Sequence, residues 1–279
     1  MRTLIHVSDL HFGRVDPQLI DPLLAFAHAA RPDLVVVSGD LTQRARSVEF
    51  AAARGFLDAL PTPQIVVPGN HDIPLHNVFN RFVRPLDRYR RYITEDLAPV
   101  WQDDEIAVFG INTARSMTIK DGRVSESQLA QLKTRLEALD DRLTKVIVTH
   151  HPFDLPDANA GTDLVGRAPA AMQMLAGCGA DLLLAGHFHT SHAASSSARY
   201  PMARYAALVV QAGTATSTRG RGESNSFNVI RIDAARITVE RYSWEAGSGE
   251  FLLSSTNAFT RSADVWAPLP QGVDLPAPP

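Results

Sequence analysis

The chain has 279 residues, of which 45% are hydrophobic and 20% are charged, and its net charge is −3. This composition is typical of a globular α/β protein, and its slightly acidic balance gives no electrostatic reason to expect a nucleic-acid partner. The single cysteine, Cys178, excludes an internal disulfide and a cysteine-rich metal site.

Five short apolar segments rich in Val, Ile and Leu recur along the first two thirds of the chain. Each lacks clean alternation and is too short for a helix, which is typical of strands buried on both faces. The five segments are residues 3–9, 33–40, 64–72, 145–151 and 181–189.

Amphipathic stretches between these segments predict helices over residues 17–30, 47–59 and 125–139. Pro22 falls in the first turn of the first helix, and serines (Ser47 and Ser125) are the expected N-caps of the other two. Strands that alternate with helices in this way predict right-handed βαβ units.

The last third of the chain is richer in predicted strands, at residues 208–213, 226–233 and 236–244, with turn signals between them. We expect these strands to form a second sheet packed on the first. The pattern predicts a single domain over residues 1–260 and a C-terminal tail over 261–279, which is Pro-rich from Pro268 and extended or disordered.

All five buried segments end in residues that can bind metals, and six of the ten histidines belong to this set. The set is Asp9 and His11, Asp40, Asn70 and His71, His150 and His151, and His187 and His189. A single motif of this kind is weak evidence because each also occurs in ordinary turns. The carboxyl ends of parallel strands meet at one edge of a sheet, so five such ends predict one site.

Carboxylate, imidazole and amide donors without thiolate suit Mn, Fe, Zn or Ni better than Mg or Ca. Two metals about 3.5–4 Å apart can clamp the attacking and leaving oxygens of a phosphoryl displacement, and water bound between them ionises near neutral pH. Glycines precede three of the ligand positions (Gly39, Gly69 and Gly186), and we expect them to let the backbone turn sharply.

The motifs D-x-H (9–11), G-D (39–40), G-N-H-D (69–72), H-H-P (150–152) and G-H-x-H (186–189) together resemble the calcineurin-like metallophosphoesterase family. They occur in family order, and the chain is similar in particular to bacterial cyclic-nucleotide and glycerophosphodiesterase-like members. The resemblance implies an α/β fold, a four-layer α/β/β/α sandwich in which two mixed sheets pack face to face with flanking helices.

The resemblance also implies two groups of metal ligands that share one carboxylate. The first metal is bound by Asp9, His11 and His189, the second by Asn70, His150 and His187, and Asp40 bridges them. His71 becomes the candidate catalytic residue, which protonates the leaving group or stabilises the transition state. His151 is not a ligand, and it lines the pocket or contacts the substrate.

Charge supports this allocation of ligands. Two divalent ions carry +4, the two carboxylates Asp9 and Asp40 return −2, and a bridging hydroxide leaves about +1 for an anionic phosphoester. The neutral amide of Asn70 preserves that surplus, which an aspartate would cancel. Asp72 either orients His71 or stabilises the turn, and the sequence leaves both roles open.

Arg44 and Arg219 follow two strand ends and are candidate substrate contacts, although most arginines are simply exposed. The basic segment 81–92 is interpreted as a solvated helix face rather than as a recognition surface.

The function predicted from the resemblance is hydrolysis of a small-molecule phosphodiester, such as a 3',5'-cyclic nucleotide, by a metal-bridging hydroxide. The alternatives are a phosphomonoesterase, a nuclease and a non-catalytic metal-binding scaffold. The net charge argues against the nuclease, and the intact ligand set argues against the scaffold. The oligomeric state stays open, with a homodimer as one option.

No apolar run approaches the roughly 18 residues that a membrane helix needs. The N-terminus reaches Asp9 before any apolar segment of secretory length develops. We therefore expect no membrane span and a cytoplasmic location.

Overall fold

The computed structural model describes residues 1–75, 77–118, 120–155, 164–219 and 222–269. Within these ranges the strands form a seven-stranded and a six-stranded sheet. The larger sheet contains β1 (Arg2–Val7), β2 (Leu34–Val37), β3 (Gln64–Val66), β10 (Ser226–Asp233), β11 (Arg236–Glu245), β12 (Glu250–Ser262) and β13 (Val265–Pro268). The smaller contains β4 (Val100–Gln102), β5 (Ile106–Gly110), β6 (Thr144–Val148), β7 (Leu182–Ala185), β8 (His192–Ser195) and β9 (Leu208–Gln211).

Both sheets are mixed. The larger sheet has the order β13-β12-β11-β10-β1-β2-β3, in which β1, β2 and β3 are parallel and β10 pairs with β1 antiparallel. The smaller sheet has the order β4-β5-β6-β7-β9-β8, in which β5, β6, β7 and β9 are parallel. The expectation that the C-terminal strands form a sheet of their own is wrong. The strands at 226–233 and 236–244 extend the larger sheet as β10 and β11, whereas the strand at 208–213 joins β7 in the smaller sheet as β9, because a buried apolar segment does not specify its neighbour.

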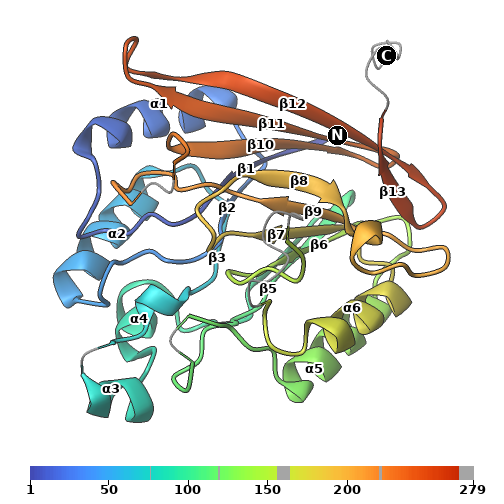
Figure 1. Ribbon diagram of the computed structural model, residues 1–279, viewed down its shortest axis with the longest axis horizontal. Helices are drawn as coiled ribbons and strands as arrows, with labels where there is room; N and C mark the ends of the chain where they lie inside the picture. Colours follow the sequence, from blue (N-terminus) through green and yellow to red (C-terminus); the bar gives the residue numbers. More distant parts are fainter. Residues whose placement is uncertain (76, 119, 156–163, 220–221, 270–279) are drawn as a thin grey trace.

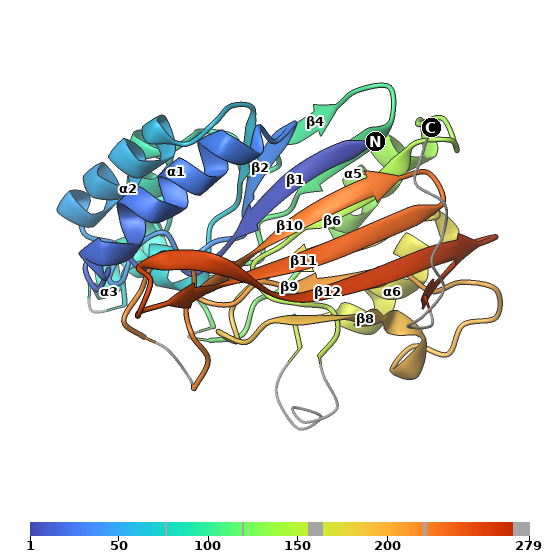
Figure 2. The ribbon, with the colours of Figure 1, turned by 90° about the horizontal axis from the view of Figure 1, so that it is seen from above.

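Helices cover both outer faces of this pair of sheets (Figure 1 and Figure 2). The helices are α1 (Ile20–Ala30), α2 (Ser47–Ala59), α3 (Val78–Val83), α4 (Asp87–Tyr92), α5 (Glu126–Glu137) and α6 (Ala168–Gly177), with 3₁₀ turns η1 (Pro17–Leu19), η2 (Asn70–Asp72) and η4 (Ser196–Ala198). Among the described residues, no helix combines the length and apolar content required to cross a bilayer.

Strand side chains alternate between two apolar layers. In β2, Leu34 and Val36 pack against the other sheet, whereas Val35 and Val37 join the cluster that includes α1 and α2. The smaller sheet repeats the pattern, with Ile147 in the cluster formed with α5 and α6. Three apolar clusters therefore separate four layers, and the α/β/β/α sandwich implied by the sequence is confirmed.

Two helix starts show how local chemistry sets the loops around the strand ends. Before α5, the hydroxyl of Ser125 accepts the amide three residues on (3.1 Å), as expected. At α2 the N-cap is Arg46 rather than Ser47, because the buried Glu49 carboxylate accepts the amides of Arg46 (3.2 Å) and Arg44 (2.8 Å).

The C-terminal strand joins the two sheets. Strand β13 ends at Pro268, so the sheet extends past the boundary expected at residue 260, and residues 270–279 of the expected tail lie outside the described residues. Trp266 in β13 is 1% exposed, and its indole N–H donates to Asp181 Oδ1 (2.9 Å), which directly precedes β7 of the other sheet.

Trp266→Ala should lower the free energy of unfolding by about 3–5 kcal/mol, because it leaves a large cavity between the sheets. Denaturant unfolding measures this change. The control Leu253→Ala, on the exposed part of β12 (53% exposed), should shift stability by less than about 0.5 kcal/mol. Equal effects of the two substitutions would show that β13 does not pack as described.

Candidate metal centre

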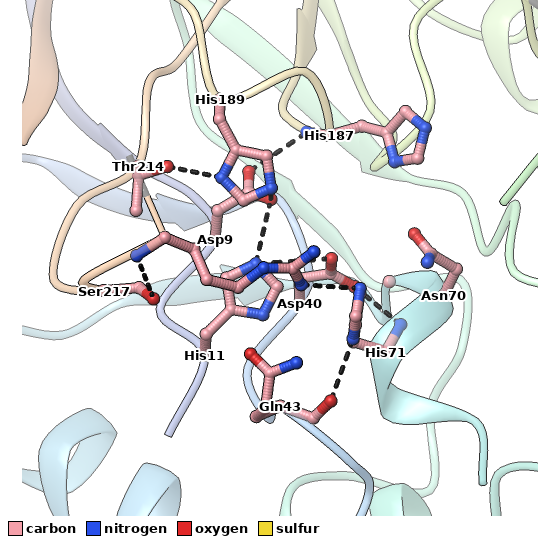
Figure 3. A network of polar contacts seen from close by, with 12 residues as sticks. Asp9, His11, Asp40, Gln43, Asn70, His71, His187, His189, Thr214 and Ser217 are labelled. Carbon is pink, nitrogen blue, oxygen red and sulfur yellow. Dashed lines mark hydrogen bonds and ion pairs between the residues drawn. The ribbon is translucent and has the colours of Figure 1, made fainter. Parts of the chain in front are cut away.

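Polar residues that follow strands of both sheets converge on one site, and Figure 3 shows Asp9, Asp40 and His187 among them. Asp9, Asp40 and Asn70 follow β1, β2 and β3 of the larger sheet, while His150 and His187 follow β6 and β7 of the smaller one. The parallel strands of both sheets thus direct their carboxyl ends to one region, where α/β proteins place their sites. The expected convergence is found, but across two sheets rather than along one.

The first donor group is centred on Asp9. Its Oδ1 lies 3.5 Å from His11 Nε2 and 3.6 Å from His189 Nε2, and all three side chains are buried. Its Oδ2 accepts the Ser8 hydroxyl (2.7 Å) and the His187 amide (3.0 Å). One carboxylate oxygen therefore fixes the loops, and the other faces two imidazole rings.

Two atoms of this group are buried without a hydrogen bond. Among the described residues, neither Asp9 Oδ1 nor His11 Nε2 has such a partner. Leaving a buried carboxylate oxygen unsatisfied is unfavourable, and proteins rarely tolerate it. A cation bound between the two atoms would satisfy both, so the donor set fits a metal ion.

The second donor group meets the first at Asp40. His150 Nε2 lies 3.4 Å from Asp40 Oδ2 and 3.1 Å from Asn70 Oδ1, and the His187 ring centroid is 5.1 Å from that of His150. Asp40 Oδ2 also lies 3.7 Å from His11 Nε2 of the first group. Asp40 thus stands between the two groups, where a shared carboxylate would have to be.

Backbone carbonyls orient the histidine rings. His150 Nδ1 lies 2.8 Å from the Ser38 carbonyl oxygen, and His11 Nδ1 lies 3.4 Å from that of Thr42. A carbonyl oxygen only accepts, so Nδ1 carries a hydrogen and Nε2 is the nitrogen directed at the donor group. A metal bound there would take the place of any proton on Nε2, as metal-binding histidines require.

The buried aspartates and histidines of the site shift one another's pKa values. Burial alone would raise the pKa of Asp40, but the nearby histidines, His150 first, hold it well below its usual value, and His189 and His11 do the same for Asp9. Burial lowers the pKa of His150, yet the carboxylates raise it to about 9. Both aspartates are thus in the ionised form that binds metals.

Five members of the set have strained backbones. Their φ angles are positive, at 54° for Asp9, 48° for His11, 53° for Asp40, 79° for His187 and 61° for His189. For a residue other than glycine this left-handed conformation costs about 1–2 kcal/mol. Such clustering is typical of functional sites, where the surrounding structure holds residues in unfavourable conformations.

Asp72 anchors the turn that carries Asn70 and His71. Its carboxylate accepts the amides of Gly69 (2.9 Å), Leu41 (3.2 Å) and Thr42 (2.9 Å) and the Thr42 hydroxyl (2.9 Å). Burial, together with the charge of Asp40, raises its pKa to about 6. Of the two roles left open by the sequence, these bonds support the structural one, since they join the loops after β2 and β3.

His71 lies beside the donor groups rather than within the buried core of the site. Its amide donates to Asp40 Oδ1 (2.8 Å), and its ring Nδ1 donates to the Gln43 carbonyl (2.8 Å). Its Nε2 accepts from Arg219 Nη1 (2.8 Å). Burial lowers the pKa of His71, and the positive charge of Arg219 adds to this effect. The ring is therefore neutral, with Nε2 directed at an arginine.

A cavity of about 300 Å³ adjoins His71 and Asn70. Both arginines singled out in the sequence, Arg44 and Arg219, line it, and so do Arg81 and Lys120, which the sequence analysis did not select. No acidic side chain is among the described residues that line it. The cavity is therefore strongly cationic, although the chain as a whole is acidic.

His151 is 2% exposed and both of its ring nitrogens are engaged, with Thr113 Oγ1 (2.8 Å) and with the Lys120 carbonyl oxygen (2.8 Å). These bonds leave neither nitrogen directed at a ligand. The expected substrate contact through His151 thus finds no support in its position. Its connection to the cavity is indirect, since it hydrogen-bonds to the backbone of Lys120, which lines the cavity.

The sequence matches the calcineurin-like phosphoesterase family over residues 2–191. The chain belongs to this family. It is 30% identical over 166 residues to the glycerophosphodiester phosphodiesterase GpdQ of Enterobacter lignolyticus, a match that covers 56% of this chain and 59% of that protein. It is 28% identical over 160 residues to a probable cyclic nucleotide phosphodiesterase of Synechococcus, covering 54% and 58%. The chain thus spans less than two thirds of these relatives.

Solved structures of metallophosphoesterases share the fold. A purple acid phosphatase, PPD1 of yellow lupin, superposes with a TM-score of 0.73 at 10% identity over 93% of this chain and 54% of that one. A dimetal phosphatase of Danio rerio superposes with a TM-score of 0.65 at 15% identity, covering 90% and 98%. At such identities the likeness establishes the fold alone.

In this calcineurin-like protein the glycines before the ligands are required mainly for space. Gly39 has a φ of +95°, so the expected sharp turn is found there. Gly69 has a φ of −103°, which any residue adopts, but a Cβ atom there would overlap Asp40 Oδ1. A Cβ at Gly186 would overlap the Ser8 hydroxyl. Backbones approach the carboxylates too closely for any side chain.

Gly69→Ala should destabilise the protein by about 1–3 kcal/mol, because the added methyl group displaces a buried carboxylate. Thermal or denaturant unfolding checks this. The matched control is Gly55→Ala in α2, where nothing lies within 4 Å of the added Cβ and a gain of about 0.5–1 kcal/mol is expected. If both variants were equally stable, the close approach to Asp40 would be refuted.

Proposed function

We propose that this chain is a dinuclear-metal phosphoesterase that hydrolyses a small-molecule phosphodiester. The observation that carries the proposal is the position of the buried Asp40 between two donor groups, next to a cationic cavity. A pair of adjacent metals favours displacement at phosphorus, and cationic walls favour an anionic ester.

The two donor groups divide the proposed ligands. We assign Asp9, His11 and His189 to one ion, Asn70, His150 and His187 to the other, and Asp40 to both. Nitrogen and oxygen donors of this kind fit Mn, Fe or Zn, and they do not distinguish among them. When bound, the ions would lower the pKa of water and neutralise charge on the phosphoryl group.

His71 and Arg219 would act together on the ester. The bond from His71 Nδ1 to the Gln43 carbonyl fixes the ring so that Nε2 faces the cavity. Arg219 now donates to that nitrogen. A phosphoester in the cavity offers Arg219 an anionic partner, and its negative charge favours protonation of the freed Nε2 from solvent, so that Nε2–H can donate its proton to the leaving-group oxygen. Arg44, on the same wall, would bind the phosphoester as well.

Two observations favour a small diester over other phosphoesters. A cavity of about 300 Å³ has the size of a small-molecule site rather than a polymer groove. The similar proteins from Enterobacter lignolyticus and Synechococcus are described as phosphodiesterases. The second candidate, a phosphomonoesterase, is favoured by the four cations of the cavity. Comparing kcat/KM for bis-p-nitrophenyl phosphate and p-nitrophenyl phosphate decides between them.

Asp40→Asn should reduce turnover of bis-p-nitrophenyl phosphate in the presence of Mn by more than about a hundredfold, since metal stabilisation of the transition state supplies several kcal/mol. Asp58→Asn, an exposed aspartate of α2, is the matched control and should retain full activity. Circular dichroism verifies the fold of both. Activity retained in folded Asp40→Asn would contradict the shared ligand, whereas no turnover by the unmodified chain with Mn supplied would favour a non-catalytic scaffold.

Arg219→Met should lower kcat/KM for the diester by about 10–100-fold, because a hydrogen bond to a charged group contributes about 1.5–3 kcal/mol. Steady-state kinetics measures the loss. Arg236→Met, at an exposed position in β11, serves as control. A loss no greater than that of the control would remove Arg219 from the proposed substrate contacts.

A further inference from the structure

An exposed apolar surface lies beside the cavity. Helix α3 exposes Val78 (65%), Phe79 (67%), Phe82 (53%) and Val83 (58%), which occupy positions i, i+1, i+4 and i+5 and so share one face. Leu75, which precedes α3 and is 46% exposed, lines the cavity itself. Leu75 thus belongs both to the exposed apolar residues of this region and to the lining of the proposed active-site cavity.

An ordinary surface helix buries its apolar side, whereas α3 exposes its apolar side to solvent. The residue that it buries is Arg81, 6% exposed, whose Nη2 donates to the Thr118 carbonyl (2.6 Å) and whose Nη1 donates to that of Pro74 (3.4 Å). Met117, next in sequence to the Thr118 that Arg81 contacts, is 84% exposed and is counted with these apolar residues. We call Leu75, Val78, Phe79, Phe82, Val83 and Met117 the α3 face.

The clustering is not a general property of this surface. All 12 phenylalanines lie within the described residues, and the exposed ones are Phe79 and Phe82. Figure 1 places α3 at the lower edge of the molecule, away from the sheets. A contiguous apolar patch on an outlying helix marks a contact surface.

The residues of α3 and the helix that follows it are rich in positive charge. Residues 78–92 contain five arginines and one acidic residue, Asp87, in a chain whose net charge is −3. Arg84, Arg90 and Arg91 are exposed. Arg88 of α4 donates to the Ala45 carbonyl (2.7 Å), so the loop that carries the exposed Arg44 and Arg46 lies against α4, and Arg44 lines the same cavity as Leu75.

We propose that the α3 face docks the protein on an anionic lipid bilayer, with its aromatic and aliphatic side chains in the interface and the arginines on headgroup phosphates. Apolar side chains ringed by basic ones are the combination that binds such surfaces peripherally. Docking would place the cavity mouth at headgroup level. The basic segment 81–92 is then a recognition surface rather than the solvated helix face inferred from sequence.

Two other occupants fit less well. In a symmetric dimer the same patch contacts itself, so two copies of a segment with five arginines and one acidic residue would be brought together. A nucleic-acid duplex would pair with the arginines but would leave Phe79 and Phe82 without an apolar partner, and a single strand, whose bases could stack on the phenylalanines, would leave the valines of α3 in water. A bilayer satisfies the charge and the apolar surface together. This inference does not depend on the proposed hydrolytic activity.

Vesicle flotation of the full chain tests the docking. The protein should float with vesicles of 70% phosphatidylcholine and 30% phosphatidylglycerol and not with pure phosphatidylcholine. Phe79→Ser/Phe82→Ser should weaken the partition about tenfold or more, because each buried phenylalanine contributes substantially to insertion. Leu252→Ser/Leu253→Ser, which alters exposed leucines of β12 (45% and 53%), is the matched control and should bind normally.

A second pair of variants tests the charge. Arg90→Ala/Arg91→Ala should weaken binding about 30-fold, whereas Arg236→Ala should not. The proposal would be overturned if the protein bound neutral vesicles as well as anionic ones, or if it bound neither kind. It would also be overturned if the protein were a dimer that the double-serine variant converts to a monomer. The double-serine variant should hydrolyse soluble bis-p-nitrophenyl phosphate normally. Vesicle binding by a chain without phosphoesterase activity would leave docking intact and refute the function alone.

Discussion

Two buried carboxylates, Asp9 and Asp40, lie within reach of the same histidines, and the site is arranged around their charge. Burying an ion is unfavourable unless positive charge or hydrogen bonds compensate it. In the polypeptide alone, His150 supplies part of that compensation, while Asp9 Oδ1 has no hydrogen bond within the described chain. The protein therefore holds a concentrated negative charge that two cations would complete.

The fold supplies what this charge requires. Parallel strands from both sheets end in one region, and short loops deliver the donors with positive φ angles that would be unfavourable elsewhere. The apolar layers on both sides of each sheet keep the strand ends rigid, and Asp72 joins the loops after β2 and β3. The strain at the site is thus offset by packing and hydrogen bonds around it.

Sequence reasoning located the strand ends because buried strands followed by Asp, Asn and His form a regular pattern. It misassigned the C-terminal strands because β10 is as apolar as a strand of either sheet. The sequence did not identify Arg81 as part of the cavity, because a helix with phenylalanines and arginines is expected to bury the phenylalanines. Tertiary contacts, such as the bond to the Thr118 carbonyl, are what show that the arginine is buried and Phe79 exposed. The role of Gly69 likewise depends on Asp40, which is distant in sequence.

The central claim is that Asp40 lies between two metal ions. Anomalous diffraction from crystals grown with Mn²⁺ tests it most directly, because it reports positions without relying on activity. The account predicts two peaks about 3.5–4 Å apart, with Asp40 between them, one near Asp9 and the other near His150. A single peak, or two peaks that do not share Asp40, would contradict it.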